Sequence, residues 1–416
     1  MARIKTAVNV EIGLKPYSTP KDTKFTPLHD GSHSHRLYDG RRHDGLLDLL
    51  QDKLKAMKEA SRTSKKEGED DNEILPLLRL ESFLMPQPPV LLARHPSSLS
   101  GSPPKGENVS LKQLYGTYKE QIGRGSSGVV RVTFRPHSID HPTGGQLFAV
   151  KKFSHREKET TKKYMKRLGA EFCISSSLHH INVIQTLDLM KDDGDGGFCQ
   201  IMEYCSGGDV YTRVRSLGGD GLSAVEANCY FKQLLRGLEY LHKTGVAHRD
   251  IKPDNLLLTR RGCLKIADFG NAECIRLPWE KQVKLTTGLC GSFPYISPEQ
   301  YTVIEYGKPK SSYYFDARAV DVWAAGVVYM DMRTGKHVWR YAVVDRDAQY
   351  EEFVRDMEEY GCWDPIEMLQ GAACRQTIYA MLDINWKTRP SVSDILKSDW
   401  VSSVHVCAVG ESGDSM

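Results

Sequence analysis

Hydrophobic and polar positions change their pattern near residue 113. From Tyr115, apolar residues recur on both sides of a glycine turn, which predicts a strand, a tight turn and a second strand over 115–132. In the second half, Ser223 and Glu226 have the spacing of a helix capping box. Apolar residues follow at helical intervals, namely Cys229, Leu234, Leu238 and Leu241. The pattern predicts an α+β arrangement in which a small β-rich lobe precedes a larger helical lobe, with the functional site between them.

Residues 1–113 lack this globular pattern. Their Pro/Ser-rich stretches and the charged run 61–73 can bury little apolar surface, so we expect a largely disordered regulatory region. A short helix is predicted over 44–60 by an apolar stripe formed by Leu47, Leu50, Leu54 and Met57. This stripe fits either a fluctuating helix or a docking or autoinhibitory helix. We expect a folded domain over 114–401 and a flexible tail over 402–416.

Composition narrows the cellular setting. The 56 Lys+Arg and 53 Asp+Glu residues leave a formal charge of only +3, which gives no global electrostatic attraction for nucleic acid. The 10 cysteines are scattered singly and no secretory apolar segment is present, which is typical of reduced thiols inside a cell. No apolar run reaches the length of about 18 residues that a membrane span needs. We therefore expect a cytoplasmic protein without a nucleic-acid partner or a transmembrane span. The sequence does not determine its oligomeric state.

A glycine-rich turn is the first chemical signal. Gly123, Gly125 and Gly128 form G-x-G-x-x-G, in which absent side chains let backbone N–H groups approach a phosphate. The same pattern also suits a tight hairpin or a dinucleotide-binding turn, but the latter needs a helix directly after it, whereas 129–132 reads as a strand. Lys151 ends a later apolar strand, and a carboxylate on a helical stretch, Glu171, could pair with it.

The strongest signal is the loop 248–255, His-Arg-Asp-Ile-Lys-Pro-Asp-Asn, which combines a candidate base, a cation and a metal-binding amide. The motif Asp268-Phe269-Gly270 then supplies a carboxylate of the kind that Mg²⁺ prefers. In this order and spacing, the motifs over 115–401 resemble the eukaryotic protein kinase family.

The resemblance implies an ATP-dependent serine/threonine protein kinase that uses ATP and Mg²⁺. Asp250 corresponds to the base that accepts the substrate hydroxyl proton, and Lys252 to the cation that stabilises the transferring phosphoryl group. Asn255 and Asp268 correspond to the Mg²⁺ ligands.

The resemblance also implies a nucleotide pocket that includes the three glycines, Lys151 and Glu171. Met202 would be the gatekeeper, Glu203 and Cys205 would offer backbone hydrogen bonds, and Asp209 would contact the ribose. The residues implied to enclose adenine are Ile122, Val130, Ala149 and Leu257.

Several positions bear on substrate class. Lys252 and Ser292 resemble their counterparts in serine/threonine rather than tyrosine kinases, which implies protein substrates with Ser or Thr acceptors. Asp209 and Asp254 stand where kinases that prefer basic sequences place carboxylates, although the ribose role of Asp209 leaves this preference open. Structurally, Glu299 should pair with Arg389.

Four segments, 171–174, 178–180, 291–295 and 315–323, are similar to fungal kinases that regulate nutrient permeases and potassium transport. That family typically carries a longer N-terminal region than this chain has, so substrate and regulation do not follow from the resemblance alone.

Two positions depart from the kinase pattern. Ser175 replaces an apolar residue, which should weaken packing around the helix that carries Glu171 and make activity depend on a further contact, with the N-terminal segment as the candidate. The usual phosphosite aligns with Gly288, and we expect Glu273 to pair with Arg249 in place of a phosphate, which leaves Thr286 and Thr287 as optional sites.

Two other functions compete with the protein kinase interpretation. A pseudokinase scaffold or interaction module would keep the fold without transferring phosphate. A small-molecule kinase fits less well, because 292–299 resembles a peptide-positioning platform.

Overall fold

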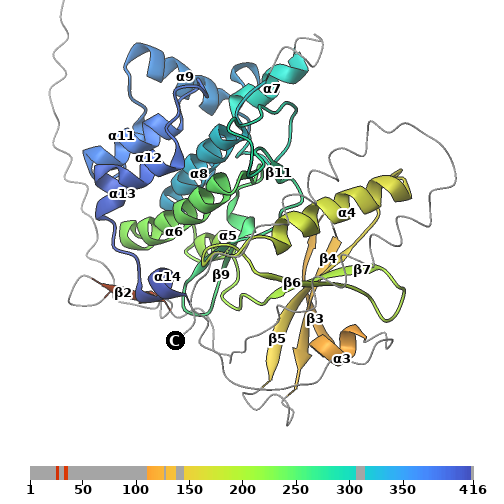
Figure 1. Ribbon diagram of the computed structural model, residues 1–416. Helices are drawn as coiled ribbons and strands as arrows, with labels where there is room; N and C mark the ends of the chain where they lie inside the picture. Colours follow the sequence, from red (N-terminus) through yellow and green to blue (C-terminus); the bar gives the residue numbers. More distant parts are fainter. Residues whose placement is uncertain are drawn as a thin grey trace, which may run out of the picture.

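The computed structural model describes residues 25–27, 32–35, 110–125, 128–136, 145–305 and 314–413, and Figure 1 shows a sheet lobe beside a helical lobe. The sheet lobe holds five antiparallel strands in the order β3-β4-β5-β7-β6. Their bounds are β3 Thr117–Gly125, β4 Gly128–Arg135, β5 Gln146–Phe153, β6 Thr186–Lys191 and β7 Phe198–Glu203. Together the lobes confirm the expected two-lobed α+β fold.

Two helices accompany the sheet. Helix α3 (Leu111–Tyr115) begins at a Ser110 capping box and buries Leu111 and Tyr115 against the sheet core. Helix α4 (Thr161–Ser176) packs beside β6 and carries Glu171 into the space between the lobes. The small lobe therefore places a helix-borne carboxylate opposite the strands that carry the glycine turn and Lys151.

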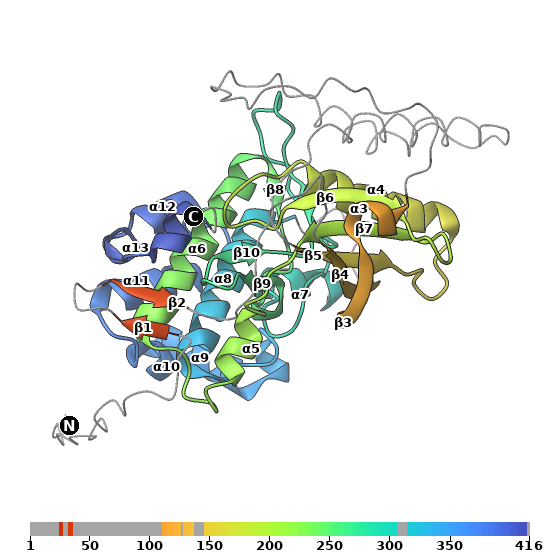
Figure 2. The same ribbon diagram turned by 90° about the horizontal axis from the view of Figure 1, so that it is seen from below.

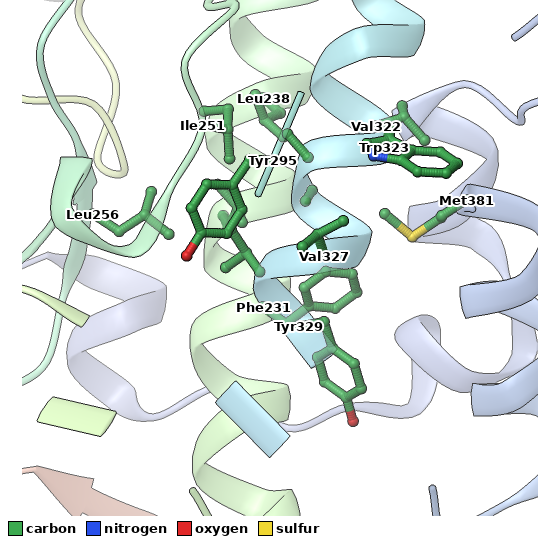
Figure 3. Close-up of a cluster of buried hydrophobic side chains, with 14 of the residues drawn as sticks. Phe231, Leu238, Ile251, Leu256, Tyr295, Val322, Trp323, Val327, Tyr329 and Met381 are labelled. Atoms are coloured by element: carbon green, nitrogen blue, oxygen red, sulfur yellow. The ribbon is translucent and has the colours of Figure 1, made fainter. Parts of the chain in front are cut away.

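The helical lobe is built around α6 (Ala224–Lys243) and α8 (Ala317–Thr334), which pack together. Ser223 caps α6 through the N–H of Glu226 at 3.2 Å, which confirms the predicted capping position. Helix α8 ends at Gly335, whose left-handed backbone (φ 67°) suits glycine. The core includes Phe231 of α6 against Tyr329 of α8, with ring centroids 4.8 Å apart, as Figure 3 shows.

Shorter elements complete this lobe. The helices are α5 Val210–Arg215, α7 Pro298–Glu305, α9 Ala348–Glu359, α10 Asp364–Glu367, α11 Ala372–Met381, α12 Val392–Lys397, α13 Asp399–Ser403 and α14 Ala408–Ser412. The strands are β8 Val246–Ala247, β9 Leu256–Leu258, β10 Leu264–Ile266 and β11 Glu273–Cys274. Two 3₁₀ turns span Pro253–Asn255 and Val344–Arg346. Of the helices described, none is long and apolar enough to cross a bilayer.

The chain ends differ from the sequence expectation. Within 1–113, the structure has a hairpin of β1 (Phe25–Pro27) and β2 (His33–His35) that lies against the helical lobe in Figures 1 and 2. Beyond residue 401, where we expected a flexible tail, α14 forms and Cys407 and Val409 are buried. Both ends are ordered by packing on α6, a contact that local sequence patterns do not reveal. The helix expected over 44–60 lies outside the described residues.

A buried ion pair fastens α7 to the end of the domain, as predicted. Arg389 donates from both terminal guanidinium nitrogens to the carboxylate of Glu299, at 2.7 Å each, and also bonds the carbonyl of Ala319. The Arg389 side chain is fully buried, so these partners replace the water that a guanidinium group would otherwise bind.

We expect Arg389→Ala to lower the free energy of unfolding by about 3–5 kcal/mol, because it leaves the Glu299 carboxylate buried without its cation. Arg355→Ala is the matched control, since Arg355 pairs with Asp356 at the surface, and its cost should stay below about 1 kcal/mol. Urea unfolding monitored by tryptophan fluorescence measures both. Equal effects of the two substitutions would contradict the structural role of the pair.

Candidate functional site

Three charged groups from three elements meet between the lobes. Nζ of Lys151, on β5, donates to Oε1 of Glu171 at 2.5 Å and to Oδ1 of Asp268 at 2.7 Å. The Lys151 and Glu171 side chains are almost fully buried, whereas the Asp268 side chain keeps 40% of its exposure. The structure therefore brings together the cation and two carboxylates that the sequence placed far apart, with Asp268 on the accessible side.

Electrostatics keeps this lysine protonated. Burial lowers the pKa of Lys151, but attraction to Asp268 and Glu171 outweighs it, so the net pKa is raised. Burial raises the pKa of Glu171, and Lys151 offsets only part of that rise. Asp268 has a left-handed backbone (φ 64°), an uncommon conformation for a non-glycine residue that aims its carboxylate at Lys151.

The loop 248–255 places Asp250 among polar groups. Its Oδ1 accepts from the Ser292 hydroxyl at 2.8 Å, and its Oδ2 accepts from the Asn271 amide at 3.3 Å. Nζ of Lys252 donates to the same Ser292 oxygen at 2.7 Å and lies 3.4 Å from Asp250 Oδ2. Asp250, Lys252 and Ser292 thus form one connected group in which a carboxylate, a cation and a hydroxyl meet.

Asn255 lies beside both parts of the site. Its side-chain amide donates to the backbone oxygen of Asp250 at 2.9 Å, and its backbone carbonyl accepts from the N–H of Ala267 at 2.9 Å. Asn255 therefore links the loop that carries Asp250 to the segment that carries Asp268.

One carboxylate of α8 holds the loop in place. Asp321 accepts from the backbone N–H groups of His248 at 2.9 Å and Arg249 at 2.7 Å, and it also bonds the His242 ring at 2.9 Å. Asp321 is fully buried, and Arg249 takes the left-handed conformation (φ 64°) within the turn that it fixes. These contacts of Asp321 and the hydrogen bond of Asn271 to Asp250 were not predicted from the sequence.

The glycine turn leads into a strand, as expected, rather than into a helix. Gly123 pairs with Val130 and Gly125 with Gly128 across β3 and β4. A Cβ at Gly128 would lie 2.0 Å from the carbonyl oxygen of Lys152, so the fold itself requires glycine there. At Gly125 a Cβ would meet nothing within 4 Å. Packing therefore does not explain the glycine at 125.

The remaining predicted nucleotide residues line adjoining elements. Ala149 and Met202 are paired across β5 and β7, and a backbone bridge joins Asp209 to Leu257. Ile122 lies on β3 with 46% of its surface exposed, and Cys205 is buried.

Two of these residues have other partners within the protein. The Glu203 carboxylate lies 3.0 Å from Lys265, and Asp209 caps α5 by accepting from the N–H of Thr212 at 2.6 Å. Burial raises the pKa of Asp209, while this cap counteracts the rise.

The predicted pairing of Arg249 with Glu273, in place of a phosphate, is confirmed. Arg249 Nη1 donates to Glu273 Oε2 at 2.5 Å, and the Thr286 hydroxyl donates to the same oxygen at 2.7 Å. Gly288, at the aligned phosphosite, has a left-handed backbone (φ 94°). The carboxylate of Glu273 therefore holds together the arginine and the segment that a phosphate joins in other kinases.

The surroundings of Ser175 are not loosely packed, contrary to our expectation. It is fully buried, donates to the Phe172 carbonyl at 3.3 Å and accepts from the Gln200 amide at 3.0 Å. Gln200, on β7, also donates to the Thr186 hydroxyl at 2.9 Å. A hydrogen-bonded network from the sheet thus holds α4 where an apolar contact was expected.

We expect Ser175→Ala to destabilise the fold by about 1 kcal/mol through the lost acceptor for Gln200. Ser175→Leu should cost more, about 1–3 kcal/mol, because it overfills a buried site. Ser402→Ala, at an exposed serine, is the control and should change the unfolding free energy by less than about 0.5 kcal/mol. Chemical unfolding curves measure all three, and a stabilised Ser175→Leu protein would disprove the network's role.

Comparison with known proteins agrees with this geometry. The family model described as Protein kinase domain matches residues 117–401. The chain is 45% identical over 400 residues to serine/threonine-protein kinase hal4 of Schizosaccharomyces pombe, covering 95% of this chain and 59% of that protein. It is 46% identical over 310 residues to serine/threonine-protein kinase HAL4/SAT4 of Saccharomyces cerevisiae, covering 74% and 49%.

A further relative, the probable serine/threonine-protein kinase HAL5-like of Kluyveromyces lactis, is 34% identical over 340 residues, covering 75% of this chain and 42% of that protein. The chain thus spans about half the length of the curated relatives that it matches.

Proposed function

Because this chain belongs to the protein kinase family, we propose that it transfers the γ-phosphate of ATP to serine and threonine hydroxyls of proteins. The observation that carries the proposal is the connected group of Asp250, Lys252 and Ser292 beside the Lys151 ion pairs. Each group that phosphate transfer requires is present, which favours an active kinase over a pseudokinase scaffold.

The residues fit an ATP–Mg²⁺ complex. Asp268 and Asn255 offer the hard oxygen ligands that Mg²⁺ prefers, and Asp268 remains accessible. Gly125 has no packing reason to lack a side chain, which suits backbone approach to a phosphate. Bound Mg²⁺–ATP would supply the phosphoryl donor, with the metal offsetting its negative charge. The pocket residues described above would contact the adenine and the ribose.

The chain's own groups divide the work of transfer. Lys151, held by Glu171, would place its charge on the phosphates, so that binding fixes their position. Asp250 would orient the acceptor hydroxyl and accept its proton. Lys252 would stabilise charge on the transferring group, and its hydrogen bond to Ser292 keeps it beside Asp250.

Substrate class rests on fewer contacts. Lys252 with Ser292 supports a serine/threonine acceptor, since the two are bonded to each other beside Asp250. A preference for basic sequences is carried by Asp254, whose side chain is exposed, more than by Asp209, which already caps α5. The four segments similar to fungal transport-regulating kinases support a cytoplasmic role in nutrient or ion transporter regulation.

Asp250→Asn should lower phosphate transfer to a serine peptide roughly 10²–10⁴-fold, because the hydroxyl loses its proton acceptor. Transfer of radiolabelled phosphate to a peptide library with serine, threonine or tyrosine acceptors measures rate and preference together. Unchanged circular dichroism and ATP affinity serve as controls for folding and binding. Transfer to small molecules alone, or no transfer by the wild type with Mg²⁺ or Mn²⁺, would overturn the proposal.

Phosphatase-treated protein should retain full activity, because Glu273 already supplies the negative charge that Arg249 needs. Glu273→Ala should lower activity by separating Arg249 from the segment that contains Thr286. The matched control is Glu352→Ala, at an exposed position on α9. Complete loss of activity after phosphatase treatment, recovered by rephosphorylation, would contradict this role of Glu273.

A further inference from the structure

Four potential metal ligands from distant parts of the chain meet beside helix α6 of the helical lobe. His33 and His35 lie on β2, Cys229 lies on α6, and Cys407 immediately precedes α14. One ligand atom of each side chain lies within 4.8 Å of the others, and all four residues are buried. None of them belongs to the nucleotide or substrate site described above.

Their arrangement follows from the fold. Residues two apart on a strand point to the same face, so His33 and His35 both turn inward while Ser34 between them is exposed. At Gly262 an added Cβ would lie 2.4 Å from the Cβ of His35, so this glycine lets β2 approach the domain. Phe25 covers both imidazoles, with ring centroids 5.4 Å from each. The hairpin is thus seated with its histidines toward α6.

The imidazole nitrogens have unmet bonding capacity. Both ring nitrogens of His33 and Nε2 of His35 are buried without a hydrogen-bond partner among the described residues. Buried polar atoms are nearly always bonded, and leaving one unpaired costs about 1–3 kcal/mol. A neutral imidazole has one nitrogen lone pair, so each of the two rings offers one that has no partner, which points to a ligand that accepts a lone pair from each ring.

The surrounding contacts suit a metal centre. Nδ1 of His35 lies 2.9 Å from the Tyr230 hydroxyl, a partner that orients the ring and leaves Nε2 free to coordinate. The sulfur of Cys229 accepts from the Gln233 amide at 3.4 Å, and that of Cys407 accepts from the Gly410 N–H at 3.4 Å. Each sulfur thus already accepts one N–H hydrogen bond, as the sulfur of a metal-bound cysteine commonly does.

We propose that His33, His35, Cys229 and Cys407 bind one structural Zn²⁺ ion that fastens both chain ends to helix α6. Two imidazoles with two thiolates are a ligand set that zinc takes in tetrahedral sites, and four protein ligands leave no open position for catalysis. Zinc distances of about 2.0–2.1 Å to nitrogen and 2.3 Å to sulfur put ligand atoms roughly 3.3–3.8 Å apart. The observed cluster needs only a small contraction.

The ion would supply stability that the two end segments lack. The hairpin has only three residue pairs, and α14 has five residues, so neither element is stable by itself in water. Only Cys229 lies inside the matched region 117–401, while the histidines precede it and Cys407 follows it. A zinc ion here would cross-link the hairpin and the segment before α14 to α6, in addition to the packing that already holds both segments on this helix.

The test uses the full chain purified without added metal or chelator. Inductively coupled plasma mass spectrometry should find about one zinc per chain, and Co²⁺ exchange should give the intense visible absorption of a tetrahedral thiolate site. His33→Asn and Cys407→Ser should each reduce zinc to about a tenth or less. The matched controls, His405→Asn and Cys362→Ser at exposed positions, should retain the wild-type content.

A second measurement guards against misfolding of the variants. Chelation by EDTA should lower the thermal unfolding midpoint of the wild type, zinc should restore it, and Cys407→Ser should show neither shift. Wild-type protein without zinc, variants that keep it, or a Cys229–Cys407 disulfide found by mass spectrometry under non-reducing conditions would each overturn the proposal. Kinase activity is not a readout here, so failure of the zinc site leaves the proposed function intact.

Discussion

The buried carboxylate of Asp321 is the constraint on which the site depends. It accepts two backbone N–H groups from the loop 248–255 and bonds the His242 ring, which couples that loop to α6 and α8. A fully buried carboxyl group is costly unless it is hydrogen-bonded, so the loop conformation and the Asp321 side chain stabilise each other. The left-handed turn at Arg249 persists under this restraint, and it sets where Asp250 and Lys252 lie.

Two polar substitutions in this structure replace interactions that the kinase pattern leads one to expect. Glu273 holds Arg249 and Thr286 with a fixed carboxylate, so the segment is ordered without a switchable charge. Ser175 is joined to Gln200 and Thr186, so α4 is held by directional bonds rather than by apolar packing. In both cases one element is positioned by the specific geometry of a hydrogen bond, which tolerates less displacement than a hydrophobic contact.

The metal cluster extends this organisation beyond the kinase core. The core region 117–401 contains the residues proposed to bind phosphate and to act as the base, whereas three of the four cluster ligands lie outside it. The match to the Schizosaccharomyces pombe relative covers 95% of this chain and therefore also reaches beyond the core. The proposed zinc site includes Cys229 of α6, and His242 of the same helix contacts Asp321. The hairpin, the segment before α14 and the loop 248–255 are thus all attached to α6.

The sequence by itself determined the order of the motifs and hence the two-lobed fold. Glycine turns and capping residues can be recognised from the spacing of a few neighbouring residues, and the kinase pattern sets which charged residues pair. It also anticipated the Arg389–Glu299 pair from the kinase pattern and the Arg249–Glu273 pair from a departure from that pattern. It misjudged Ser175, because the partner that satisfies this serine comes from another strand. It missed the cluster of His33, His35, Cys229 and Cys407 for the same reason. Single cysteines and a short His-x-His pattern signal nothing until folding brings them within 4.8 Å, and only tertiary packing decides that.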